Sequence, residues 1–159
     1  MDANFLLAWV MRWLHVVGAV VAVGATVLMR FGVLPALATL PNGEEILDAI
    51  RKPYKRLIHS AIGILLLTGL YNYIVVAIPK VRALREIPQY AGSISSYHSI
   101  MGAKILLSLA LFGIAMALLA PVPSMHAQRK TWLSVNVVLG LLILLLAAYL
   151  RRIWPVPTG

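Results

Sequence analysis

The four histidines are the residues of this chain best suited to binding a metal or a cofactor, and the chain contains no cysteine. His15 lies in the apolar stretch RWLHVVGAVVAVGATVLMRFG, one helical turn after Arg12. Imidazole nitrogen ligates iron, copper and zinc. Because ionisable groups inside membrane segments are costly and usually functional, we expect His15 to bind a cofactor. The absence of cysteine excludes disulfides, thiolate metal sites and covalent haem attachment through Cys residues.

Small residues follow His15 at helical spacing, including Gly18, Ala19 and Ala22. One interpretation is that they allow two membrane helices to pack closely. The other is that Gly18 and Ala22 leave room for a flat macrocycle, haem b, whose iron is held by His15. The sequence leaves both interpretations open.

Three further polar residues belong to the same side of the membrane as His15, because successive spans alternate in direction. If Lys104 is level with Arg12, His15 lies about 4.5 Å inside that level and His98 about 9 Å outside it. His98 can then be a second iron ligand only if its helix shifts or tilts. Lys104 and Asn72 are closer to the level of His15, and the charges of Arg12 and Lys104 would tune the potential of a bound haem.

The other two histidines belong to the opposite side. His59 begins its apolar segment and could ligate a second haem. His126, in the stretch PSMHAQRK, is expected to be an exposed loop residue.

Two methionines make copper the alternative cofactor. Met11 and His15 are spaced i, i+4, and His98 and Met101 are spaced i, i+3, so each pair can share a helix face. Thioether and imidazole together form a ligand set suited to Cu(I).

The elements that must position these residues are membrane helices. Of the 159 residues, 61% are hydrophobic and 12% charged, with a mean hydropathy of +0.89. This composition is too apolar for a soluble domain of this size. Long apolar segments predict transmembrane helices over about 5–38, 57–78, 97–120 and 131–152. We therefore expect one domain, 1–159, that is all-α: an integral membrane four-helix bundle.

The connections and charges complete the predicted topology. The sequence indicates a short interfacial helix within 40–56, interrupted by Pro53, and a long loop over 79–98.

The net charge of +9 comes from basic residues at span ends, where they contact lipid headgroups, so we expect no nucleic-acid partner. The 14 basic residues divide equally between the two sides, which leaves orientation undecided. We expect a multi-pass protein of the bacterial cytoplasmic membrane.

Three stretches carry a resemblance to known membrane families. RWLHVVGAVVAVGATVLMRFGVLPAL resembles the first helix of CopD-like copper-resistance domains and of HemJ-type protoporphyrinogen oxidases, which are small four-helix membrane proteins. MGAKILLSLALF is similar to the HemJ-type third helix, which has a lysine at the position of Lys104. RKTWLSVNVVLGLLILLL resembles the fourth helix, where an asparagine falls at Asn136. The resemblance implies a haem- or porphyrin-handling bundle that uses His15 and Lys104.

The chain also departs from the HemJ-type pattern. Gly102 replaces a histidine two residues before the lysine, and Val137 and Leu139 replace an acidic residue and a proline. These departures favour a b-type haem protein over the porphyrinogen oxidase. We therefore expect a membrane oxidoreductase or electron carrier whose partner is a quinone or another redox protein. Copper handling, porphyrinogen oxidation and a non-catalytic structural role are the alternatives.

Overall fold

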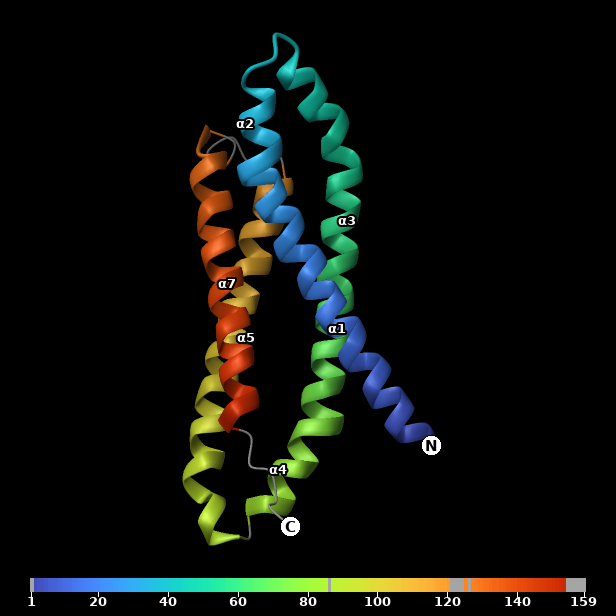
Figure 1. Cartoon of the computed structure of the whole chain (residues 1–159), viewed down its shortest axis with the longest axis vertical. Coiled ribbons are helices and arrows are strands. Elements are labelled where there is room, and N and C mark those ends of the chain that lie inside the picture. The colour runs from blue at the N-terminus through green and yellow to red at the C-terminus, as the bar shows by residue number, and fades with distance from the viewer. Residues whose placement is uncertain (1, 86, 121–124, 126, 154–159) are drawn as a thin grey trace.

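The computed structural model describes residues 2–85, 87–120, 125 and 127–153. Its helices form four rods, shown in Figure 1. The first rod is α1 (Ala3–Leu28), a π-helical turn η1 (Met29–Val33) and α2 (Leu34–Leu37), and the second is α3 (Gly43–Tyr71), a π-helical turn η2 (Asn72–Ala77) and α4 (Ile78–Arg85). After a 3₁₀ turn η3 (Pro88–Tyr90), the third rod is α5 (Ala91–Leu119) and the fourth is α7 (Arg129–Ile153).

The predicted all-α membrane bundle is confirmed. The four helical segments Ala3–Leu37, Gly43–Arg85, Ile94–Leu119 and Arg129–Ile153 are long and apolar enough to cross a membrane. Large apolar side chains are exposed on the outside of the bundle: Leu67 is 73% exposed and Leu106 is 69% exposed. Such a surface suits contact with lipid acyl chains rather than water.

The second rod is longer than the predicted 57–78 segment. It runs for 43 residues, which is about 64 Å and twice the thickness of the hydrocarbon layer. The predicted interruption at Pro53 is wrong, because α3 continues through this residue. Proline removes one backbone N–H donor, but the buried residues around it, including Leu47 and Ile58, keep the helix packed.

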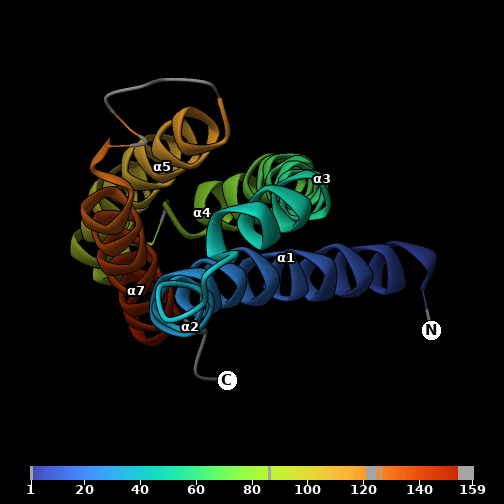
Figure 2. The same cartoon turned by 90° about the horizontal axis from the view of Figure 1, so that it is seen from above.

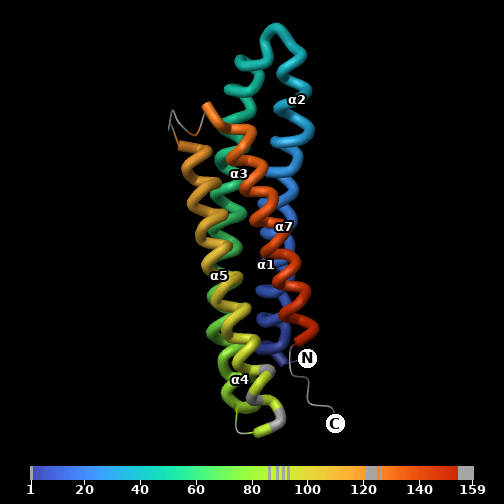
Figure 3. The backbone as a smooth tube through the Cα atoms, turned by 90° about the vertical axis from the view of Figure 1, so that its left-hand side faces the viewer, coloured from blue at the N-terminus to red at the C-terminus, as the bar shows by residue number. Residues whose placement is uncertain are grey.

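The predicted long loop over 79–98 is also wrong, because α4 continues to Arg85 and α5 begins at Ala91. Figure 3 shows α4 beside the first turns of α5 at one end of the bundle. Val81 and Leu84 of α4 are buried in one cluster with Ile94 and Tyr97 of α5. Burial of these apolar side chains outweighs the turn preferences of the intervening glycine and serines.

The bundle consists of two antiparallel hairpins. One pairs α1 with α3, the other pairs α5 with α7, and the contacts between the hairpins are fewer. Figure 2 shows α1 lying obliquely, with its end near α7 and its beginning on the far side of α3. Between hairpins, Arg30 Nε donates to Ser134 Oγ at 2.8 Å.

Small residues bring α1 and α3 close together. A Cβ atom added at Gly18 would meet Leu65 Cγ at 3.2 Å. Ala22 is buried in a cluster with Ala61 and Leu65. Gly18 and Ala22 thus lie in the contact between the two helices of the first hairpin, as the close-packing interpretation predicts.

A second close contact joins the two hairpins at mid-height. A Cβ atom at Gly140 of α7 would meet Val23 Cγ2 of α1 at 3.0 Å and Leu111 Cδ1 of α5 at 3.6 Å. Asn136 Nδ2 donates to the Leu111 carbonyl at 3.1 Å. The contacting residues therefore lie at the same height along the bundle: Val23 of α1, Leu111 of α5 and Gly140 of α7.

Candidate functional site

His15 and Lys104 lie at the same height in different hairpins. His15 precedes Val23 by eight residues and Lys104 precedes Leu111 by seven, so they lie about 12 and 10 Å from the shared level, in the same direction. Both residues are partly buried. The structure thus places these two positions at a similar height, on helices α1 and α5 that do not pack directly against each other in the described residues.

The His15 ring is oriented by Thr68 of α3. His15 Nδ1 lies 3.0 Å from Thr68 Oγ1, and the Thr68 hydroxyl donates to the Ile64 carbonyl at 2.5 Å. Since a threonine hydroxyl has one proton, its oxygen accepts from the Nδ1–H of His15. This hydrogen bond places the ring proton on Nδ1 and leaves the lone pair of Nε2 available to a ligand.

The ring also lies against the backbone of α3 at Gly69. A Cβ atom added at Gly69 would meet His15 Cε1 at 3.1 Å and Nδ1 at 3.6 Å. Sequence reasoning missed Thr68 and Gly69. The one available signal was a hydroxyl residue in an otherwise apolar run, and it did not indicate which histidine Thr68 would contact.

Asn72 and Arg12 flank this arrangement without contacting the imidazole. Asn72 Nδ2 donates to the Met11 carbonyl at 3.4 Å and so holds α1 to α3 one turn from His15. Arg12 is exposed. On α5, Ser108 Oγ donates to the Lys104 carbonyl at 2.8 Å. In the part of the chain that the structure describes, no carboxylate forms an ion pair with Lys104.

His98 is not brought to His15. It is exposed and lines a groove of about 640 Å³ with Tyr73, Arg82 and Arg85. Its neighbour Tyr97 packs in the cluster that contains Val81. His98 precedes Lys104 by six residues of α5, so it lies about 9 Å along that helix from the level of Lys104. Among the described residues, no contact joins the helix of His98, α5, to the helix of His15, α1.

The proposed copper ligands are also divided between two places. Met101 packs against the cluster around Tyr97, whereas Met11 and His15 are on α1, and α1 does not pack against α5 in the described residues. Within 2–85, 87–120, 125 and 127–153, no group of three or more His, Cys, Asp or Glu residues is arranged to hold a metal.

The opposite-side histidines are not part of this site. His59 Nδ1 lies 2.7 Å from the Lys55 carbonyl one turn earlier in α3, so the imidazole donates a local hydrogen bond. His126 lies outside the described residues.

Comparison with protein-family models, curated proteins and solved structures finds no match to this chain. The fold is a helical bundle with four segments able to cross a membrane, and in it the imidazole of His15 on α1 is hydrogen-bonded to Thr68 on α3. The CopD-like and HemJ-type resemblance stays a prediction.

Proposed function

We propose that this chain is an integral-membrane b-type haem protein in which His15 would hold the haem iron. The observation that carries the proposal is the hydrogen bond between His15 Nδ1 and Thr68 Oγ1. Haem-ligating histidines bind iron through one ring nitrogen, while a hydrogen bond to the other nitrogen fixes the tautomer and the ring orientation. His15 has this arrangement, because its Nδ1 is hydrogen-bonded to Thr68 and the lone pair of its Nε2 can bind iron.

Lys104 supports the proposal from the second hairpin. It is partly buried at a height similar to that of His15 and has no carboxylate partner among the described residues. Positive charge beside a haem stabilises the reduced iron, which carries one positive charge fewer than the oxidised iron. We assign Lys104 the role of raising the reduction potential, with the exposed Arg12 contributing a smaller, solvent-screened effect.

When bound, haem supplies a reversible one-electron step between Fe(III) and Fe(II). The residues of this chain hold the ring nitrogen in place and provide positive charge. His15 lies about 4.5 Å inside the level of Arg12, within the apolar layer. We therefore propose a membrane quinone as the electron partner, because it reaches this depth from the lipid.

The alternatives have less support. Copper handling needs Met11, His15, His98 and Met101 to converge, and the described structure divides them between two helices that do not pack together. Porphyrinogen oxidation of the HemJ type relies on a position that is Gly102 in this chain. Gly102 is exposed, and a Cβ atom there would have no neighbour within 4 Å.

The test is the absorption spectrum of the protein purified in detergent after expression with added haem precursor, first oxidised and then reduced with dithionite. We expect a Soret band and sharp reduced bands, which are lost in His15→Ala and kept in the matched controls His59→Ala and His98→Ala. A colourless wild-type protein, or one with copper and no haem by metal analysis, would contradict the proposal. A His15→Ala variant with the wild-type spectrum would support a structural role for His15.

A further inference from the structure

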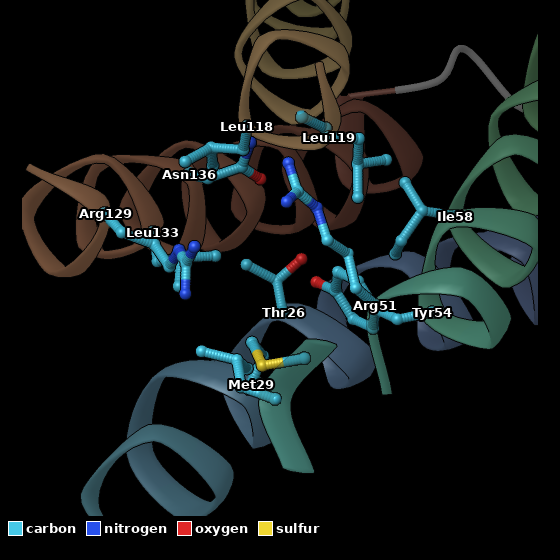
Figure 4. Close-up of a pocket in the computed structure, with 12 residues that line it drawn as sticks. Thr26, Met29, Arg51, Tyr54, Ile58, Leu118, Leu119, Arg129, Leu133 and Asn136 are labelled. Carbon is cyan, nitrogen blue, oxygen red and sulfur yellow. The ribbon is translucent and has the colours of Figure 1, made fainter. Parts of the chain in front are cut away.

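Two places in the bundle have arginine side chains beside a hollow, and they differ in whether these charges are already engaged. One is the cavity between the hairpins in Figure 4, which Arg51 and Arg129 line. Both of them interact with other residues of the chain, so their charges and donors are not available to a ligand. The other is the groove of about 640 Å³ that Arg82 and Arg85 line with His98. These two arginines are exposed, and neither has a hydrogen-bond or ion-pair partner in the part of the chain that the structure describes.

The groove lies where the two hairpins meet at one end of the bundle, between α4 and the first turns of α5 (Figure 3). Arg82 and Arg85 are spaced i, i+3 on α4, and Ser95 and His98 have the same spacing on α5, so each pair shares a helix face. Tyr73 of η2 adds a phenol group to the lining. Hydrogen-bond donors from two helices of different hairpins therefore line one groove.

The walls of the groove are formed by packed apolar side chains. Val81 and Ile94, which line it, are 4% and 8% exposed and belong to one buried cluster with Tyr97. The His98 ring lies edge-to-face with the Tyr97 ring, with 5.9 Å between the ring centroids. The groove is thus formed before any ligand enters.

The charges around the groove favour an anion. None of its described lining residues is acidic. Of the five acidic residues of the chain, three lie in the first two turns of α3, at the opposite end of the second rod: Glu44, Glu45 and Asp48. Glu86, the acidic residue nearest in sequence to the groove, is outside the described residues. Two guanidinium groups one turn apart, each a planar fork of donors, match the oxygen atoms of a phosphate.

The height of the groove indicates a lipid as the source of the phosphate. His98 precedes Leu111 by 13 residues of α5, so it lies about 20 Å from the mid-height contact between Leu111, Val23 and Gly140. The hydrocarbon layer ends about 15 Å from the centre of a bilayer, and the headgroup layer ends about 20 to 22 Å from it. The groove is therefore at the depth of lipid headgroups, and apolar lining residues such as Ile78 suit the start of an acyl chain.

We propose that this groove binds the phosphate of an anionic lipid headgroup between Arg82 and Arg85 of α4 and Ser95 and His98 of α5. The site is separate from the proposed haem site, and its occupancy does not depend on His15. A lipid bound there links the two hairpins at an end of the bundle where α4 and α5 have few direct contacts.

The experiment is native mass spectrometry of the full chain in detergent, titrated separately with phosphatidylglycerol and phosphatidylcholine. Arg82→Gln and Arg85→Gln are compared with Lys80→Gln, which removes one charge from an exposed position of α4 outside the groove lining. We expect the wild type to bind phosphatidylglycerol about tenfold more tightly than phosphatidylcholine, because the ammonium group of the zwitterionic lipid competes for its own phosphate. Each arginine variant should lose about tenfold in phosphatidylglycerol affinity, whereas Lys80→Gln should stay within about twofold of the wild type.

Two further arms test the α5 side of the groove and the source of the phosphate. The double variant with Ser95→Ala and His98→Ala removes two donors and should lose about fivefold in phosphatidylglycerol affinity. Unchanged affinity would overturn the placement of the phosphate between α4 and α5. Inorganic phosphate at the concentration of the lipid should leave the lipid bound, and displacement of the lipid would overturn its assignment in favour of a free anion.

Equal affinity for the two lipids, or an equal loss in Lys80→Gln and the arginine variants, would overturn the proposal as a whole. If a Gln variant does not elute as a single folded species, Arg82→Lys and Arg85→Lys replace it. These keep the charge and lose the planar fork, so we expect intermediate affinity. Wild-type affinity in both Lys variants would overturn the role of the guanidinium groups.

Discussion

Removing the hydroxyl of Thr68 tests whether the orientation of the His15 ring, in addition to the presence of the ring, contributes to haem binding. Thr68→Val keeps the shape of a side chain that is 3% exposed and removes the oxygen 3.0 Å from His15 Nδ1. The Ile64 carbonyl keeps its helical partner, so the main loss is the interhelical hydrogen bond. Such a bond within a membrane contributes about 0.6 to 2 kcal/mol to the packing of α1 on α3.

The larger expected effect is on haem affinity. Loss of the hydrogen bond that orients a metal-ligating histidine typically weakens binding by about 10- to 100-fold. The assay is a haemin titration of the apoprotein in detergent, with Thr68→Ser as the control that keeps the hydroxyl. We expect the haem affinity of Thr68→Val to fall by this factor and the haem affinity of Thr68→Ser to remain close to that of the wild type.

A double variant tests whether Thr68→Val weakens haem binding by acting through His15. In the His15→Ala background, Thr68→Val should cause no further loss, because the group it orients is absent. Wild-type haem affinity in Thr68→Val would refute the assignment of Thr68 as the orienting residue. An equal loss with and without His15 would show that Thr68 acts through helix packing alone.

Three other substitutions test neighbouring parts of the account. Gly69→Ala introduces a Cβ atom 3.1 Å from Cε1 of His15, so we expect the ring to move and haem titrations to show weaker binding. The control Gly24→Ala adds a Cβ atom with no neighbour within 4 Å and should leave haem binding unchanged. Lys104→Gln removes a positive charge that stabilises reduced iron, so spectroelectrochemistry should show a midpoint potential lower by tens of millivolts, and an unchanged or higher value would exclude the proposed role. Gly18→Ala places a Cβ atom 3.2 Å from a buried leucine side chain, and thermal unfolding should show a loss of about 1 kcal/mol or more, against no loss for Gly24→Ala.

The helices were predictable because lipid requires every backbone polar group to be bonded within the segment, so long apolar runs become helices. The errors came where tertiary packing decides. Pro53 and the 79–98 segment carry local turn signals. Burial of Leu47 and Ile58 holds α3 together through Pro53, and burial of Val81 and Ile94 in one cluster extends α4 and α5 through the second segment. No local pattern predicts a cluster formed by two segments from different helices.

The candidate site could be predicted only in part, because it also depends on how the helices pack against one another. His15 was recognisable as an ionisable residue in an apolar segment, and counting residues from the span ends placed Lys104 near its level. Thr68 and Gly69 depend on how α1 and α3 align, which the close contact between Gly18 and Leu65 fixes.

The most direct test of iron ligation by His15 is imidazole rescue of His15→Gly. Apoprotein of this variant is titrated with haemin in the presence and absence of added imidazole, beside wild-type apoprotein. If His15 holds the iron, the variant binds haemin weakly alone and regains the wild-type absorption spectrum when imidazole occupies the place of the missing ring. Haemin uptake by His15→Gly with the affinity and spectrum of the wild type, without imidazole, would contradict it.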